Sequence, residues 1–139
     1  MNIHTAVPTK RPAIVAYLAQ ALGGALFGVA LGGAAGLIGA RLFAGTSDSW
    51  GDLIAAIVGA MIGYTIGVSI GVYLIGRWLS GRGGYWRALL GGVVGAALVL
   101  LAAEPLHLNQ NTAVLQTFLI ALPPIGATLG FNMSRKARR

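Results

Sequence analysis

Long stretches without a charged side chain constrain this chain more than any other feature. A helix needs about 20 apolar residues to cross a hydrocarbon core of about 30 Å, and these runs lack the alternation of barrel strands. The first, second and fourth of these stretches are long enough. The third is long enough if its helix begins near Gly84 and the Arg87 side chain reaches back to the headgroups. The uncharged stretches are residues 12–40, 53–76, 88–103 and 112–133.

The composition supports the same interpretation. Charged residues make up 9% of the 139 residues, whereas about a quarter is usual in soluble domains. The absence of cysteine excludes disulfide frameworks and thiolate metal sites. The chain is therefore predicted to be one all-α membrane domain over residues 1–139, an integral four-helix bundle with spans at about residues 12–42, 52–78, 84–104 and 112–133.

Each predicted helix boundary carries turn or capping residues. Asp52 would lie near the positive end of the second helix dipole, and residues 80–84 (SGRGG) predict a turn. Pro105 is expected to end the third helix. The candidate N-capping residues are Ser47, Asp48 and Ser49 before the second helix, and Asn111 or Thr112 before the fourth.

The basic residues are unequally divided between the two sides of the predicted bundle. With the N-terminus inside, nine of the ten basic residues lie inside and all three acidic residues lie outside, as the positive-inside rule expects. Both termini are therefore predicted to be cytoplasmic, in a bacterial-type inner membrane. The basic tail is interpreted as an anchor at anionic lipid rather than as a nucleic-acid site. The predicted headgroup and topology residues are Arg77, Arg82, Arg87, Arg135, Lys136, Arg138 and Arg139.

Glycine accounts for 22 residues and recurs at every fourth position in the spans. Four residues advance a helix by about 400°, so such glycines form a shallow groove that lets a neighbouring backbone approach closely. The simplest arrangement is a glycine-zipper hairpin of the first two spans, closed by the third and fourth. Such a groove serves static packing or, alternatively, an oligomer interface or a pore lining. The predicted packing residues are Gly24, Gly28, Gly32 and Gly36, then Gly59, Gly63, Gly67 and Gly71, and Gly92 in a weaker row of Gly84, Ala88, Gly92 and Ala96.

No group of residues in the sequence is arranged for catalysis. The acidic residues lie outside the uncharged spans, and the two histidines, His4 and His107, are far apart in the sequence. Asp48 and Asp52 are interpreted as helix-capping residues rather than as a metal or acid pair. Ser69 has no base at membrane depth. We therefore expect no enzymatic activity, no cofactor and no metal.

The fourth span carries the strongest candidate for a functional feature, the pair Pro123 and Pro124. Consecutive prolines remove two amide donors, which frees the carbonyls of Leu119 and Ile120. A helix broken in this way could line a path for water or a solute, as in transporters. The alternative is a structural kink whose threonines satisfy the freed carbonyls. The small and polar residues on about one face of this span are Thr117, Ala121, Pro124 and Thr128.

Two strings resemble segments of small, glycine-rich, four-span bacterial membrane proteins, GYTIGVSIGVYLIG at residues 63–76 and PPIGATLGFNMSR at residues 123–135. The resemblance covers about residues 59–135 and implies a four-span fold without an assigned activity. The glycine spacing is also similar to that of the mitochondrial inner-membrane translocase channel family, but the Arg-x-x-x-Asp signature of that family is missing after Arg41. The membrane carboxylate of small multidrug exporters and rotor subunits is missing, and so is the Thr/Phe/Ser-rich third span of fluoride channels.

These features together predict a non-enzymatic integral membrane protein that acts by packing against other proteins. We expect an accessory, assembly or scaffold subunit of a larger membrane complex, or a homo-oligomer, whose partners are the lipid bilayer and other membrane proteins or itself. The alternative is a small channel or transporter for a neutral or hydrophobic solute that uses the kinked fourth helix. A weaker alternative is a lipid-organising protein that uses its basic rim.

Overall fold

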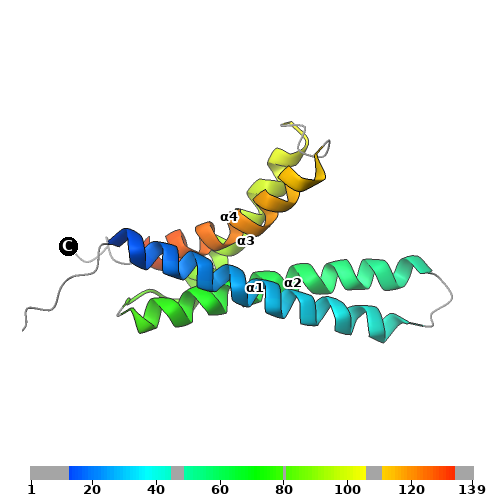
Figure 1. The fold of residues 1–139 in the computed structure, drawn as a ribbon, viewed down its shortest axis with the longest axis horizontal. Coiled ribbons are helices and arrows are strands. Elements are labelled where there is room, and N and C mark those ends of the chain that lie inside the picture. Colours follow the sequence, from blue (N-terminus) through cyan, green and yellow to red (C-terminus); the bar gives the residue numbers. More distant parts are fainter. Residues whose placement is uncertain (1–12, 45–48, 80, 106–110, 134–139) are drawn as a thin grey trace, which may run out of the picture.

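The computed structural model describes residues 13–44, 49–79, 81–105 and 111–133. In chain order the helices are α1 (Ala13–Phe43), α2 (Ser49–Trp78), α3 (Tyr85–Ala103) and α4 (Thr112–Asn132) (Figure 1). The predicted all-α, four-helix class is confirmed, and these described ranges contain no strand. All four helices are long and apolar enough to cross a membrane, which gives the chain the features of a multi-pass integral membrane protein.

The four helices form two antiparallel hairpins that meet at one end of the molecule and diverge at the other (Figure 1). α1 packs on α2 and α3 packs on α4, while the contacts between the two hairpins are fewer. The end where the hairpins meet carries Arg77, Arg82 and Arg87 and is called the basic end. The diverging end carries Asp52 and Glu104 and is called the acidic end.

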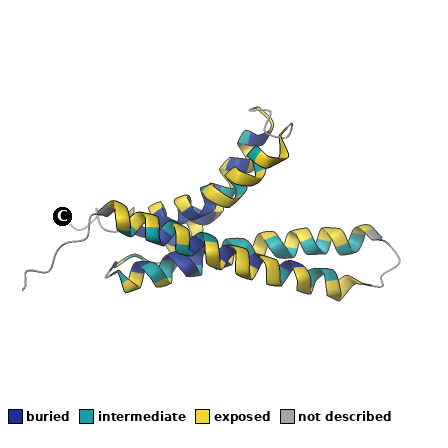
Figure 2. Ribbon diagram, in the orientation of Figure 1, coloured by how far each residue is buried: buried dark blue, intermediate teal, exposed yellow. Residues whose placement is uncertain are grey.

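A small apolar core joins the two hairpins near the basic end, where buried residues gather (Figure 2). The Phe131 ring is fully buried, and the Tyr73 ring meets it edge-on with 6.4 Å between centroids. A Cβ atom added to Gly76 or Gly83 would collide with Phe131. Glycine at these two positions therefore makes room for the largest side chain of the core. The buried members of the core are Val68, Val72, Ala88, Ala127 and Phe131.

Some helix boundaries carry the predicted turn and capping residues, whereas the candidate cap Ser49 is itself the first residue of α2. The Asn111 side chain accepts a hydrogen bond from the amide of Val114 at 3.3 Å and so caps α4. Asp52 lies in the first turn of α2, where a carboxylate is favoured by the helix dipole. Residues 81–84 are non-helical, and α3 ends two residues before Pro105. Two other candidate capping residues, Ser47 and Asp48, lie outside the described residues.

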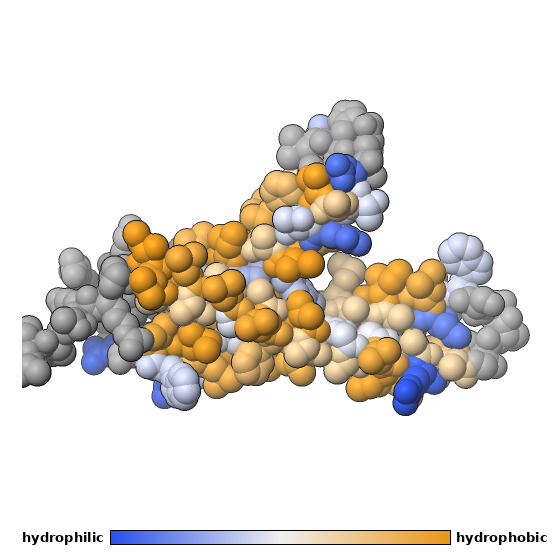
Figure 3. Space-filling model, in the orientation of Figure 1, coloured by the Kyte–Doolittle hydropathy of each residue, from blue (hydrophilic) through white to orange (hydrophobic). Residues whose placement is uncertain are grey.

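Most of the helical surface is apolar and exposed (Figure 3). Such a surface is unfavourable in water, whereas in a bilayer it is the expected exterior of a helical protein. Trp50, Trp78 and Trp86 lie at helix ends and are highly exposed, and tryptophan is enriched at the membrane–water interface. The surface therefore indicates a lipid bilayer as the environment of the four helices.

Candidate functional site

The α1·α2 seam is built on the glycine row of α2. α1 comes closest to α2 at four glycines of this row. A Cβ atom added to any of them would lie 2.5–2.7 Å from a backbone carbonyl oxygen of α1. Each step of four residues forward in α2 matches four residues back in α1. Without the glycines the two backbones could not lie this close together. The pairs are Gly59 with Ala35, Gly63 with Leu31, Gly67 with Phe27 and Gly71 with Gly23.

The glycine row of α1 lies in the same seam but is contacted largely by side chains of α2. Cβ atoms added to Gly24 and Gly28 would lie 2.6–2.7 Å from valine methyl groups of α2. Towards the acidic end, Cβ atoms added to Gly32 and Gly36 would lie 3.0–3.2 Å from their nearest neighbours. Gly33 is adjacent to this row and has no atom within 4 Å of an added Cβ. The seam is therefore tight on the row. Beside the row it is open at Gly33 but not at Gly23, where an added Cβ atom would lie 2.5 Å from Ile75 Cγ1.

The α3·α4 seam brings glycines of both helices into direct backbone contact. A Cβ atom added to Gly91 would collide with the carbonyl of Gly126, and the reverse also holds. A Cβ atom added to Gly130 would collide with the carbonyl of Arg87. At Gly95 the added atom would lie 2.7 Å from a carbonyl oxygen of α4. Neither helix fills this seam with a side chain.

Gly92, the predicted packing residue of α3, has a different neighbour. It is buried, but an added Cβ atom would lie 3.5 Å from Ser69 Oγ of α2 and 3.6 Å from Ala127 Cβ, which is ordinary contact. Gly84 has open space around it. The α3·α4 seam thus runs one residue to the side of the predicted row of Gly84, Ala88, Gly92 and Ala96. Because Gly91 and Gly92 are adjacent, the sequence alone does not show which of them makes the close contact with α4.

The proline pair lies inside α4 without ending the helix. Pro123 and Pro124 are buried, and α4 continues to Asn132. The carbonyl of Ile120, which Pro124 deprives of its usual amide donor, accepts a hydrogen bond from the Tyr64 hydroxyl of α2 at 2.6 Å. A tyrosine of the other hairpin therefore satisfies this carbonyl, and not a threonine of α4.

The predicted pathway residues of α4 lie in two different environments. Thr117 is exposed, and its hydroxyl donates to the carbonyl of Ala113 at 2.8 Å. Ala121 is also exposed, whereas Pro124 and Thr128 are buried. The face that carries these residues passes from exposed to buried towards the basic end. None of these four residues lines the groove between α3 and α4 that is described below.

Two buried amides, which the sequence interpretation missed, join the hairpins near the basic end. Asn132 Nδ2 of α4 donates to Gln20 Oε1 of α1 at 2.8 Å and to the carbonyl of Thr128 at 2.7 Å. Among the described residues, Asn132 Oδ1 and Thr128 Oγ1 have no hydrogen-bond partner although both are buried. Gln20 is the one amide side chain in residues 12–40, and a polar residue within a span is a signal for a contact between helices.

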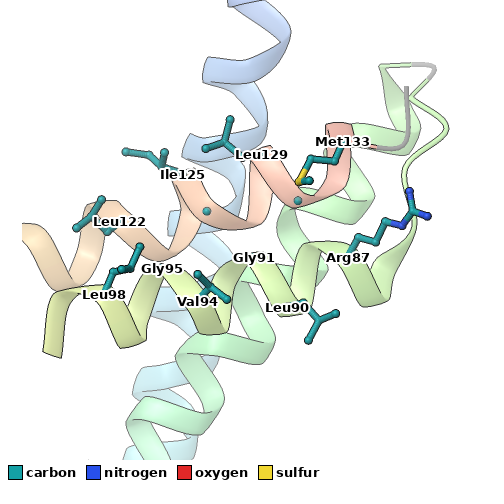
Figure 4. A pocket seen from close by; sticks show the side chains of 12 residues that line it. Arg87, Leu90, Gly91, Val94, Gly95, Leu98, Leu122, Ile125, Leu129 and Met133 are labelled. Atoms are coloured by element: carbon teal, nitrogen blue, oxygen red, sulfur yellow. The ribbon is translucent and has the colours of Figure 1, made fainter. Parts of the chain in front are cut away.

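A groove of about 710 Å³ lies on the exposed side of the α3·α4 hairpin (Figure 4). Its floor is the glycine seam, and Arg87 stands at the basic end. Its volume is within the range of ligand sites, although its walls are almost wholly apolar. The wall side chains include Leu90, Val94 and Leu98 of α3 and Leu122, Ile125 and Leu129 of α4.

The predicted headgroup residues that the structure describes are exposed at the basic end. Arg77 lies over the Tyr73 ring, with 5.8 Å from its guanidinium carbon to the ring centroid. Arg82 follows α2 in the turn, and Arg87 lies in the first turn of α3. The other predicted anchors, Arg135, Lys136, Arg138 and Arg139, lie outside the described residues.

The described helices hold no group of three histidine, cysteine, aspartate or glutamate side chains that could bind a metal ion. Comparison of the chain with protein-family models, curated protein sequences and solved structures found no match. The packing of the helices is thus the basis on which a function can be assigned.

Proposed function

We propose that this chain is a non-enzymatic accessory, assembly or scaffold subunit of a larger membrane complex, or a homo-oligomer. In this proposal it lies in a bacterial inner membrane with both termini in the cytoplasm, so that the basic end faces the cytoplasm. It binds partners through its helix surfaces and does not bind nucleic acid.

The space between the diverging hairpins, called the wedge, supports this proposal. The hydrogen bond between Tyr64 and Ile120 closes it on the basic side. On α2, Ile57 lies two turns before Tyr64 on the same face and is 51% exposed. On α4, Thr117 lies two turns before the buried Pro124 and is exposed. Both walls thus become exposed towards the acidic end, where Figure 3 shows the two arms separating.

Near the wedge, α4 carries an amide side chain that lipid tails cannot satisfy. Gln116 and Thr117 are both exposed. The Thr117 hydroxyl donates to the carbonyl of Ala113 within α4, whereas no described residue bonds the Gln116 amide. Lipid tails offer neither donors nor acceptors, whereas amide side chains in spans bond to neighbouring helices. A helix of a partner or of a second copy would satisfy Gln116 and fill the wedge. The proposal of a packing function rests on this unfilled wedge and on the exposed Gln116 amide of α4.

The alternative, a channel or transporter along α4, has less support. Its predicted lining residues are divided between exposed and buried positions, and the freed carbonyl of Ile120 is occupied by Tyr64. If solute flux into proteoliposomes depended on Pro123 and Pro124, the channel would become the better proposal. We expect no such flux.

Cysteine crosslinking in native membranes tests the packing function, because the chain contains no cysteine of its own. Ile57→Cys and Thr117→Cys place a thiol in the wedge. Leu101→Cys, on the exposed surface of α3 near the acidic end, is the control. With a thiol–amine crosslinker we expect both wedge variants to give an adduct with the same protein, identified by mass spectrometry, and the control to give none. Equal adducts at all three positions, or none in the wedge, would contradict the proposal.

A further inference from the structure

The α3·α4 groove stops partway along the hairpin. On α3 its lining runs from Arg87 to Leu98, a rise of about 17 Å at 1.5 Å per residue. One leaflet is about half of a hydrocarbon core of about 30 Å. The groove therefore has the length of a single leaflet, measured from the basic end.

The lining of this groove is apolar along its length and cationic at one end. Arg87 is the one charged lining residue, and it lies at the basic end of the groove (Figure 4). The described acidic side chains, Asp52 and Glu104, lie at the opposite end of the molecule, and no described carboxylate pairs with Arg87. Val94 and Leu129 on the two walls are more than half exposed, so they are open to whatever occupies the bilayer.

We propose that the α3·α4 groove is a binding site for one anionic phospholipid, with an acyl chain on the glycine floor and the phosphate at Arg87. A guanidinium recognises phosphate through two parallel hydrogen bonds, which is why arginine serves this purpose well. The glycine seam supplies the depth, because it removes the side chains that would otherwise fill the space between the two walls. The site belongs to the leaflet at the basic end, which is the cytoplasmic leaflet in the orientation proposed above, and anionic lipids are enriched in the cytoplasmic leaflet.

The length of the groove favours a lipid over a partner helix as the occupant. A helix that crosses the bilayer would pack along both leaflets, whereas the lining ends at Leu98 and Leu122. A lipid tail also ends near the middle of the bilayer, and its headgroup lies where Arg87 stands. Both the end point and the charge of the groove match one lipid molecule.

Native mass spectrometry of the full-length, delipidated protein tests the headgroup contact. Phosphatidylglycerol and phosphatidylcholine with identical tails are titrated in detergent. We expect one phosphatidylglycerol to bind per chain about tenfold more tightly than phosphatidylcholine, as a charge-assisted contact predicts. Arg87→Gln should abolish this preference, whereas Arg82→Gln, which removes an exposed charge at the same end but outside the groove, should preserve it. Equal losses in both variants would show general attraction to the basic end and would overturn the site.

A second pair of variants tests the acyl contact. Val94→Trp places a large ring in the groove, and Val93→Trp places the same ring on an exposed position that does not line it. We expect Val94→Trp to reduce the binding of both lipids at least tenfold and Val93→Trp to leave both unchanged. Glycerol phosphate, which has no tail, should not compete. The proposal would be overturned by full lipid binding to Val94→Trp or by effective competition from glycerol phosphate. Crosslinking of a second protein chain to the variant Val94→Cys would also overturn it.

Discussion

α1 and α2 meet along helices of 31 and 30 residues, whereas α3 and α4 meet along helices of 19 and 21 residues. In the first hairpin, glycines of α2 contact the backbone of α1, and valines of α2 fill part of the α1 row. In the second hairpin, Gly91 and Gly126 bring the two backbones together with no side chain between them. The same four-residue spacing therefore produces a filled seam in one hairpin and an open groove in the other.

We expect the largest loss of stability from a substitution that disrupts the packing of the first hairpin. Gly63→Leu introduces a side chain where an added Cβ atom alone would lie 2.6 Å from the carbonyl oxygen of Leu31. Because a backbone carbonyl cannot move aside as a side chain can, we expect a loss of about 3 kcal/mol or more in the free energy of unfolding. Denaturation in mixed detergent micelles measures it. Gly33→Leu, at the open position beside the α1 row, is the control. An equal loss in that variant would show that the loss does not arise from the close contact between α1 and α2.

The next effect distinguishes the α3·α4 seam from the predicted packing residue Gly92, which lies beside it. Gly126→Ala would push a methyl group into the carbonyl of Gly91, whereas Gly92→Ala meets neighbours at ordinary contact distances. We expect a loss of about 1–3 kcal/mol for the first variant and a change within about 0.5 kcal/mol for the second. Thermal unfolding of the two variants in detergent tests this. A larger loss of stability in Gly92→Ala than in Gly126→Ala would show that Gly92 lies in the close contact between α3 and α4.

A smaller effect concerns the contact between the two hairpins. Asn132→Leu leaves Gln20 buried without its partner, so we expect a loss of about 1–2 kcal/mol. The double variant with Gln20→Leu should recover part of that loss, because an apolar pair has no unsatisfied group. A double-mutant cycle measures the coupling. Strictly additive losses would mean that the two amides do not interact.

The smallest effect concerns the proline pair. Tyr64→Phe removes the hydroxyl that donates to the carbonyl of Ile120, and we expect a loss of about 1 kcal/mol. In a Pro124→Ala background the amide of residue 124 can donate to the same carbonyl, so Tyr64→Phe should then cost little. Unfolding measurements on the four proteins of this cycle check the prediction. An unchanged cost in the Pro124→Ala background would mean that Tyr64 does not compensate for the proline.

The sequence predicts the helices and misses most of the contacts between them. Uncharged runs and capping residues such as Asn111 depend on local chemistry, so they place four helices. The hydrogen bond between Gln20 and Asn132 joins residues 112 positions apart, and the partner of Ile120 comes from another helix. Neither pairing follows from spacing within one span. The groove likewise depends on which of two adjacent glycines of α3 meets α4.

The register of the first hairpin is tested most directly by disulfide formation in native membranes. In the variant Gly36→Cys/Ala60→Cys the two Cβ atoms would lie 3.2 Å apart, a few tenths of an ångström below the range of about 3.5–4.5 Å in disulfides, so a small shift of the helices suffices to form the bond. In Gly33→Cys/Ala60→Cys the first position faces open space. We expect the first pair to form an intramolecular disulfide upon mild oxidation and the second pair to remain reduced. Efficient crosslinking of the second pair, with none in the first, would contradict the glycine seam on which this account depends.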